Sequence, residues 1–250
     1  MEKGQAFYEG KAKILYTVED PDFIIQFFKD DATAFNAQKR GSIGDKGIMN
    51  NAISEVLFKL LEAEGIPTHF IKRLSDREMQ VRKLEMIPVE AVMRNVVAGS
   101  LAKRFGLAEG TSLSMPVLEY YYKSDPLDDP MINEHHIRAM GLATDTEMKE
   151  VEALSFRINE ILKDFFDRRN LILVDFKLEF GRYHGKILLG DEICPDTCRL
   201  WEKGTLEKLD KDRFRRDLGK VEEAYQEVAR RLGILPESGP RDMKGPAVMQ

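Results

Sequence analysis

The sequence has 250 residues, of which 43% are hydrophobic and 32% charged, a balance typical of a soluble globular protein with a substantial core. Its net charge of −5 gives no overall positive field that would favour nucleic acid. No apolar run approaches the roughly 18 residues of a membrane span, and the first ten residues lack the apolar segment of a signal peptide, so we expect a cytoplasmic protein.

The N-terminal residues predict antiparallel strands over 7–16 and 23–28, joined by a turn at 20–22. Gly10 permits a tight turn or the close approach of a ligand. Lys11 and Lys13 follow it on the first strand. Alternating lysines on a strand usually face solvent, so solvent exposure and phosphate binding both stay open for them.

A glycine-rich cationic loop over 35–51 precedes a helix. Its backbone N–H groups suit an anion, although the spacing matches neither a Walker A loop nor G-x-G-x-x-G. Apolar residues at helical spacing predict a helix from Gly47 to Glu64, which Gly65 and Pro67 end. The loop therefore leads into a helix N-terminus, which favours anions.

Residues 68–97 predict short strands, and a short helix follows over 101–105. Glu90 and Arg94 share one strand face, and Ser100 can cap the helix. Arg94, Ser100 and the helix start could together bind a phosphate. The alternative is a surface Arg–Glu pair and an ordinary N-cap.

A strand with three tyrosines precedes an acidic loop within 113–136. Its carboxylates lack the spacing of an EF-hand. His135 and His136 are adjacent, so they cannot both face the same way from a strand. We expect no strong metal site in this loop.

Two long helices are predicted in the second half of the chain. Thr144 and Glu147 form a capping box at the start of a helix that reaches Asp167, and apolar spacing predicts another helix over 212–232. Between them, Asp196-Thr197 is expected to cap a short helical turn that carries Arg199 and Trp201.

The two cysteines, Cys194 and Cys198, lie four residues apart in CPDTC. No histidine follows closely enough to complete a zinc set, so the pattern favours two reduced, packed thiols.

Residues 171–191 (LILVDFKLEFGRYHGKILLGD) form the central hairpin of our prediction. From Val174 to Phe180 apolar and charged residues alternate, giving an apolar face and an ionic face. With a three-residue loop over 183–185, Glu179 lies opposite Leu189 and diagonal to Asp191, with both carboxylates on one face. One alternative is a solvated outer face, and the other is a Mg²⁺ and phosphate site.

The order of these elements predicts an α+β protein with two lobes and a cleft. We place a β-rich nucleotide-binding lobe at 1–85, an α+β substrate- and metal-binding lobe at 86–233, and a flexible tail at 234–250, where proline, glycine and polar residues accumulate.

Six segments together resemble the SAICAR synthetase family, from near the N-terminus to about Gly233. They are YEGKAK (8–13), FNAQKRGSIGDKG (35–47), IPVEAVMRNVVAGS (87–100), DDPMINEHH (128–136), LVDFKLEFG (173–181) and DEICPDTCRLW (191–201). The resemblance implies a two-lobed fold related to ATP-grasp and kinase-like nucleotide binders, with ATP in the cleft. It also implies a homodimer.

The implied reaction joins L-aspartate to carboxyaminoimidazole ribonucleotide (CAIR) with ATP and Mg²⁺, through an acyl phosphate, in purine biosynthesis. The resemblance implies a role for each candidate residue. The catalytic pair is Lys177 and Asp175. The ATP-binding set is Gly10, Lys11, Ala12, Lys13, Leu15, Arg82, Leu84, Met86 and Lys123. The CAIR-binding set is Glu90, Arg94, Ser100 and Arg199. The aspartate-binding set is Lys39, Arg40, Gly41, Ser42 and Asp129. The metal ligands are Glu179 and Asp191.

Two alternative functions stay open for these residues. A kinase or ligase for another carboxylate or alcohol would keep the metal and nucleotide residues but would not need the set of Arg94, Ser100 and Arg199. A non-catalytic nucleotide-binding or RNA-binding module would not need Lys177 and Glu179, and the acidic net charge also counts against RNA.

Overall fold

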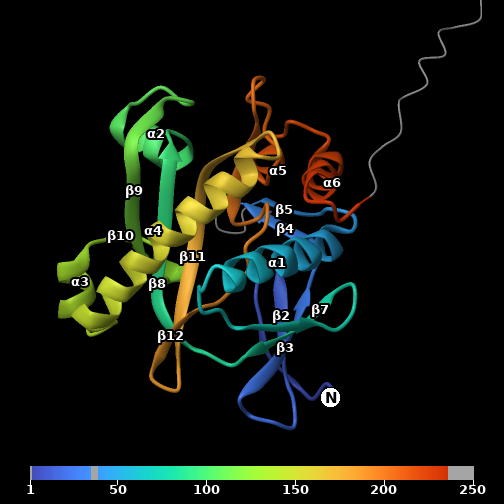
Figure 1. Cartoon of the computed structure of the whole chain (residues 1–250), viewed down its shortest axis with the longest axis vertical. Helices are drawn as coiled ribbons and strands as arrows, with labels where there is room; N and C mark the ends of the chain where they lie inside the picture. Colours follow the sequence, from blue (N-terminus) through green and yellow to red (C-terminus); the bar gives the residue numbers. More distant parts are fainter. Residues whose placement is uncertain (1, 35–38, 236–250) are drawn as a thin grey trace, which may run out of the picture.

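The strands of the chain form two large sheets and one small one (Figure 1). The computed structural model describes residues 2–34 and 39–235, so the predicted tail lies, from residue 236 onward, outside the described residues. The first sheet is antiparallel with the order β1-β2-β3-β7-β6. Its strands are β1 (Ala6–Glu9), β2 (Lys13–Thr17), β3 (Phe23–Phe28), β6 (Phe70–Arg73) and β7 (Glu78–Arg82).

The second sheet has the order β10-β9-β8-β11-β12, and β13 also pairs with β11. Its strands are β8 (Glu85–Val96), β9 (Ser112–Tyr122), β10 (Met131–Ile132), β11 (Leu171–Tyr183), β12 (Lys186–Leu189) and β13 (Cys198–Glu202). The small sheet pairs β4 (Asp31–Ala34) with β5 (Lys39–Ser42). β11 is central because β8 lies on one side of it and β12 and β13 on the other.

Helices cover both large sheets. They are α1 (Lys46–Ala63), α2 (Gly99–Phe105), α3 (Glu134–Ala139), α4 (Asp145–Asp167), α5 (Asp212–Arg215) and α6 (Val221–Arg231), with a 3₁₀ helix, η1 (Asp125–Leu127). In the part of the chain that the structure describes, no helix is long and apolar enough to cross a membrane.

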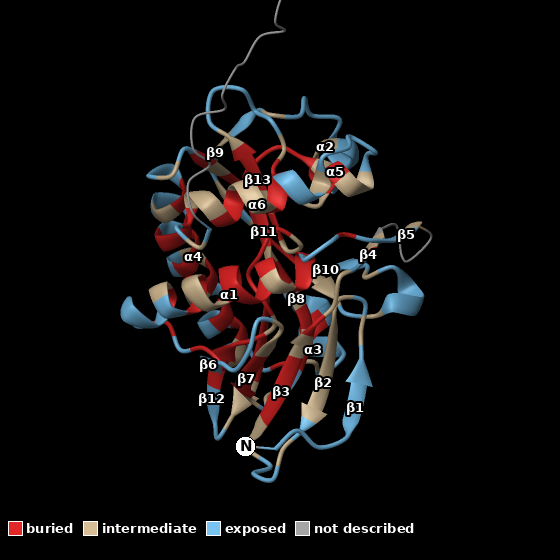
Figure 2. Cartoon of the chain, turned by 90° about the vertical axis from the view of Figure 1, so that its right-hand side faces the viewer, coloured by how far each residue is buried: buried red, intermediate tan, exposed pale blue. Residues whose placement is uncertain are grey.

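The long helices bury one apolar stripe each, as their spacing predicts. The capping box of α4 is confirmed, because the Thr144 hydroxyl accepts from the Glu147 N–H and the Glu147 carboxylate accepts from the Thr144 N–H. α4 packs on β8 and β11, and α1 packs on β3, β6 and α6. One apolar cluster runs through these elements and contains residues of both large sheets (Figure 2).

The α+β class is confirmed, because mainly antiparallel sheets and separate helices make up the described residues. The first large sheet ends at Arg82 and the second begins at Glu85. The proposed boundary at 85/86 coincides with this change of sheet and stays a prediction.

Two predictions about the C-terminal region are wrong. The expected helix over 212–232 is two helices, α5 and α6, because Asp217, Gly219 and Lys220 all have positive φ and interrupt it. The expected helical turn with Arg199 is strand β13, which pairs with the N-terminal half of β11. That half of β11 needs a ladder partner, because β12 covers only residues 180–183.

The predicted cap by Ser100 is also wrong. Helix α2 begins two residues earlier than predicted, at Gly99, with Ala98 at the N-cap and no side-chain cap. The Ser100 hydroxyl instead accepts a hydrogen bond from Arg94 at 2.9 Å. Both cysteines are free and buried, as the sequence predicts.

Candidate active site

A cavity of about 1670 Å³ lies between the two large sheets. Strands β2, β3 and β7 contribute one wall, and β8 and β11 contribute the other. All predicted site residues line this cavity except Lys39 and Ser42. The fold thus brings together predicted site residues that are up to 189 positions apart in the sequence, from Gly10 to Arg199.

The central hairpin differs from its predicted register. Tyr183 pairs with Lys186, so the loop has two residues, His184 and Gly185, with φ of 46° and 77°. Two consecutive positive φ values are typical of a type I′ turn. Glu179 therefore lies opposite Gly190, whose N–H donates to the Glu179 carbonyl at 2.8 Å, and not opposite Leu189.

Asp191 still reaches the ionic face of β11, by a different route from the one predicted. It follows the end of β12 with a left-handed φ of 56°. Its carboxylate accepts from the Lys177 Nζ at 3.1 Å. The ionic face itself is not solvated, since Asp175 and Glu179 are each only 3% exposed. The solvated alternative for this face is therefore wrong.

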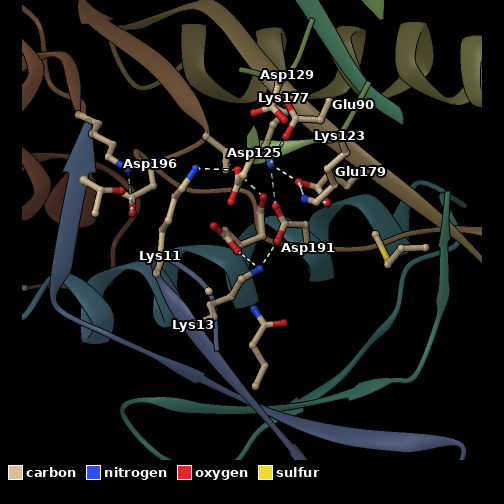
Figure 3. Close-up of a pocket in the computed structure, with 18 of the residues that line it drawn as sticks. Lys11, Lys13, Glu90, Lys123, Asp125, Asp129, Lys177, Glu179, Asp191 and Asp196 are labelled. Carbon is tan, nitrogen blue, oxygen red and sulfur yellow. Dashed lines mark hydrogen bonds and ion pairs between the residues drawn. The ribbon is translucent and has the colours of Figure 1, made fainter. Parts of the chain in front are cut away.

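Three lysines and four carboxylates form a lysine–carboxylate network on this face (Figure 3). Lys177 contacts Glu179, Asp191 and, at 3.3 Å, Glu90. Lys123 donates to both oxygens of Glu179 at 2.6 Å. Lys13, from the opposite wall, pairs with Asp191 and Glu192. The network's members are Lys13, Lys123, Lys177, Glu90, Glu179, Asp191 and Glu192.

Charge pairing in the network outweighs burial for most of its members. Burial alone lowers the pKa of Lys177, but Glu179, Asp191 and Glu90 raise it well above the ordinary lysine value. Burial alone raises the pKa of Asp191, but Lys13 and Lys177 hold it well below the ordinary value. Two carboxylates are exceptions: burial raises the pKa of Glu90, and burial together with the neighbouring Asp191 charge raises the pKa of Glu192 to about 7. Lys177 and Asp191 therefore carry opposite charges at neutral pH.

The network offers oxygen donors of the kind that Mg²⁺ takes. Glu179 and Asp191 both direct carboxylate oxygens at the Lys177 ammonium, so they converge on one cation position. The described residues contain no group of three or more His, Cys, Asp or Glu side chains arranged to hold a metal. Mg²⁺ usually takes only one or two protein carboxylates and completes its shell with water and phosphate oxygens. The donor set fits Mg²⁺ on that basis.

Two arginines lie at the other end of the ionic face. Asp175 pairs across the sheet with Arg94 of β8 and with Arg199 of β13. Its carboxylate accepts from Arg94 Nη1 at 2.8 Å and from Arg199 Nη1 at 2.9 and 3.0 Å. The expected surface pair between Arg94 and Glu90 does not form, because Arg94 is 3% exposed and pairs with Glu119 and Asp175. We call Arg94, Asp175 and Arg199 the arginine clamp.

An apolar slot continues the cavity beside the network. Leu15, Ile24, Leu84 and Met86 line it. Gly181 and Gly190 lie close against this slot: a Cβ on Gly181 would lie 2.7 Å from the Leu84 Cβ, and one on Gly190 would lie 3.1 Å from the Leu84 Cδ1. Larger residues at these glycines would displace Leu84.

Polar residues stand at the mouth of the cavity. Lys11 pairs with Asp125 at 2.8 Å (Figure 3), and Asp129 accepts from the Ser124 N–H at 2.8 Å. Arg40 and Gly41 line the cavity.

Lys39 and Ser42 do not line the cavity. Lys39 donates to the Phe214 carbonyl and to Asp217, both at 2.5 Å. Ser42 pairs with Asp31 across the small sheet.

Several cavity residues were missed by the sequence analysis. Glu192 directly follows Asp191, which was the available signal. Asp196 is buried and accepts from Lys46 at 2.7 Å and from the Tyr225 hydroxyl at 2.5 Å, contacts that no local pattern indicates. Further polar residues of the lining belong to no motif: Gln26 on β3, His69 before β6, and Lys211 and Arg215 at the two ends of α5.

Comparison with known proteins identifies the family. The model of the SAICAR synthetase family matches residues 6–232. The phosphoribosylaminoimidazole-succinocarboxamide synthase of Desulfitobacterium hafniense (strain DSM 10664 / DCB-2) is 62% identical over 232 residues, covering 93% of this chain and 98% of the relative. That of Acidiphilium cryptum (strain JF-5) is 57% identical over 254 residues, covering 100% of both chains.

Solved structures agree with these relatives. The crystal structure of the synthase from Ehrlichia chaffeensis has a TM-score of 0.91 at 48% identity and covers 93% of this chain and 100% of its own. A SAICAR synthetase (Type-2) in complex with ADP has a TM-score of 0.89 at 50% identity and covers 92% of this chain and 99% of its own. By sequence and fold alike, the chain belongs to the SAICAR synthetase family of ATP-dependent ligases in purine biosynthesis.

Proposed function

We propose that this chain joins L-aspartate to CAIR with ATP, and releases SAICAR, ADP and phosphate. A carboxylate reacts poorly with an amine, because its leaving oxygen is too basic. Transfer of the ATP γ-phosphoryl group to the CAIR carboxylate gives an acyl phosphate. The aspartate amine then attacks the acyl carbon, and phosphate leaves as the amide forms.

One observation supports this proposal above the others: one face of β11 joins the arginine clamp, through Asp175, to the lysine–carboxylate network, through Lys177 and Glu179. Asp175, Lys177 and Glu179 alternate along the strand, so neighbouring side chains on this face are about 7 Å apart. A phosphorylated substrate held at the clamp extends along the strand to Lys177. A substrate without a phosphate leaves the clamp unused, which separates the proposal from a kinase or ligase for an unphosphorylated acceptor.

The arginine clamp binds the ribonucleotide 5′-phosphate in this proposal. Guanidinium groups match phosphate oxygens in geometry and charge. Ser100 lies beside Arg94 at 2.9 Å and adds a hydroxyl, and Glu90, near Lys177, faces the base of the nucleotide. Lys177 offsets the charge of the reacting carboxylate, while Asp175 orients the clamp.

The cavity wall formed by β2, β3 and β7 binds ATP in this proposal. The apolar slot with Leu15, Leu84 and Met86 accepts adenine, and Arg82 lies beside it. Gly10, Lys11, Ala12 and Lys13 cover the phosphates, and Lys123 adds a positive charge from the opposite wall. The solved relative that contains ADP supports a nucleotide site in this fold.

Glu179 and Asp191 would hold Mg²⁺, which neutralises charge on the ATP phosphates as the phosphoryl group moves. Lys123 and Lys177 contact these carboxylates in the structure. With Mg²⁺ bound to these carboxylates, the ammonium groups of Lys123 and Lys177 would be available to phosphate and substrate oxygens, whose negative charge they would offset.

The aspartate site is placed at the cavity mouth, with Arg40, Gly41 and Asp129 as its lining residues. Lys39 and Ser42 belong to the same strand, β5, and reach the site only if that strand moves. The homodimer, the cytoplasmic location and the lobe boundary at 85/86 also stay proposals.

The test is ADP release from ATP and Mg²⁺ with CAIR, with and without L-aspartate, and detection of the product by mass. ADP formation that requires both substrates and yields the succinocarboxamide is the expected result. ADP formation with another acceptor, or with neither substrate, would overturn the substrate assignment and leave only the nucleotide site.

A further inference from the structure

Gly99 lies in direct contact with the guanidinium group of Arg199. An ideal Cβ on Gly99 would lie 2.5 Å from Arg199 Nη2, 2.7 Å from Cζ and 2.9 Å from Nη1. Real Cβ atoms essentially never approach another atom this closely. The three similar distances show that the guanidinium packs with its face on the space that a side chain at residue 99 would fill.

Arg199 cannot easily move away from this position. Its Nε donates to Asp212 at 2.9 Å, and its Nη1 donates to both oxygens of Asp175 at 2.9 and 3.0 Å. The side chains of Asp175 and Asp212 are only 5% and 2% exposed. A shift of the guanidinium would leave two buried carboxylates without this partner, which is costly.

The remaining donors of Arg199 are directed by the same packing. Within the described residues, Nη2 has no hydrogen-bond acceptor, while Nε and Nη1 are both engaged. Nη2 is also the atom closest to the missing Cβ. Its N–H groups are therefore the ones available to a substrate oxygen, and Gly99 sets where they lie.

We propose that Gly99 is a positioning residue for the substrate-phosphate subsite. Because residue 99 has no side chain, the guanidinium group of Arg199 can occupy the space beside it. This inference rests on the proposed role of Arg199 in binding the ribonucleotide phosphate. Gly99 contacts no reacting atom. Its effect passes through Arg199 alone and acts on the affinity for the ribonucleotide.

Gly99 also has a positive φ of 53°, which disfavours any side chain there. Gly106, at the other end of the same helix α2, provides a matched control. Its φ is 64°, and an added Cβ would meet no atom within 4 Å. Gly99→Ala and Gly106→Ala therefore introduce a similar backbone strain, but only the first displaces a guanidinium.

The experiment compares KM and kcat of Gly99→Ala, Gly106→Ala, Arg199→Ala and the double variant Gly99→Ala/Arg199→Ala. Gly99→Ala is expected to raise KM for CAIR by about 10-fold or more, with KM for ATP and kcat changed by less than about 3-fold. Gly106→Ala should change none of these by more than about 3-fold. The double variant should match Arg199→Ala, because nothing remains to displace.

Each possible result of this comparison either supports or overturns the inference about Gly99. Equal KM values for CAIR in Gly99→Ala and Gly106→Ala would overturn the inference, while a raised KM in Arg199→Ala would preserve the proposed function. An unchanged KM in Arg199→Ala would overturn both. If Gly99→Ala does not fold, folding of the double variant places the clash at Arg199 and supports the inference, and failure of the double variant overturns it.

Discussion

Lys13 and Asp191 form an ion pair across the cavity, although 178 residues separate them in the sequence. Lys13 belongs to the first large sheet, and Asp191 follows the hairpin of the second. Both side chains are only 14% exposed. The contact joins the two walls of the cavity at the point where nucleotide phosphates and metal are proposed to meet. The contact between the two walls therefore depends on the charge of the site.

Asp191→Asn tests the charge at this contact. The amide keeps the shape and one hydrogen-bond acceptor but removes the negative charge, so kcat should fall by about 10²–10³-fold, and more Mg²⁺ should be needed for half-maximal activity. Initial rates across a Mg²⁺ titration measure both effects. Asp167→Asn changes an exposed carboxylate that pairs with Lys203 and should behave as wild type. Unchanged rates in Asp191→Asn would show that Asp191 does not act as a ligand in the proposed Mg²⁺ site.

Lys177→Ala tests the charge beside the reacting carboxylate. Its pKa is raised by Glu179, Asp191 and Glu90 against the effect of burial, so it is an ammonium at neutral pH. Its removal should lower kcat by orders of magnitude, on the order of 10²-fold or more, with little loss of folded structure. Lys186→Ala, on the exposed part of the same hairpin, should keep wild-type rates. Equal rates in the two variants would contradict the assignment.

Asp175→Ala should destabilise the protein. The substitution removes one of the two carboxylate partners of Arg94, which keeps Glu119, and one of the two partners of Arg199, which keeps Asp212. Loss of these buried charge-assisted hydrogen bonds, with both guanidinium groups still paired once, should cost about 1.5–3 kcal/mol. Urea unfolding at pH 7 measures the free energy of unfolding. Asp164→Ala removes an exposed partner of Arg168 and should cost below about 1 kcal/mol. A similar small loss in Asp175→Ala would show that the clamp is not held by Asp175.

The fold could be predicted wherever local patterns and tertiary contacts agree. The capping box at Thr144 and the period of the apolar residues placed α4 correctly, because the same residues govern helix start and burial. Strand β13 was missed because the residues it pairs with, in the first half of β11, are 22 to 31 positions away in the sequence. The break between α5 and α6 was missed because two non-glycine residues, Asp217 and Lys220, adopt positive φ there.

The site could be predicted where family motifs and strand alternation coincide. Asp175, Lys177 and Glu179 were found because a period of two places them on one face. The position of Asp191 was right, but the register behind it was wrong, because the hairpin loop has two residues, His184 and Gly185, and not three. Gln26 and His69 were missed because a single polar residue in an apolar strand region predicts no contact. Both residues line the cavity only because the two large sheets face each other there.

His69 gives a prediction for the pH dependence of stability. It is 4% exposed, packs edge-on against Phe58, and its Nε2 has no partner within the described residues. Burial and the positive charge of Lys13 lower its pKa from 6.5 to about 3. A protonated His69 would place an unpaired charge beside Lys13, so the folded protein holds the neutral ring.

The sign of the effect follows from this difference in pKa. Between pH 6.5 and 3 the unfolded chain binds a proton at His69 and the folded chain does not, so this contribution to stability is complete above pH 6.5 and is lost as the pH falls. The loss from pH 7 to pH 5 is about 2 kcal/mol in the free energy of unfolding. His69→Gln cannot titrate and should show a loss smaller by that amount, whereas the exposed His135→Gln should keep the wild-type pH dependence. Urea unfolding at both pH values measures the difference, and an unchanged dependence in His69→Gln would show that the folded protein accepts a proton at this position.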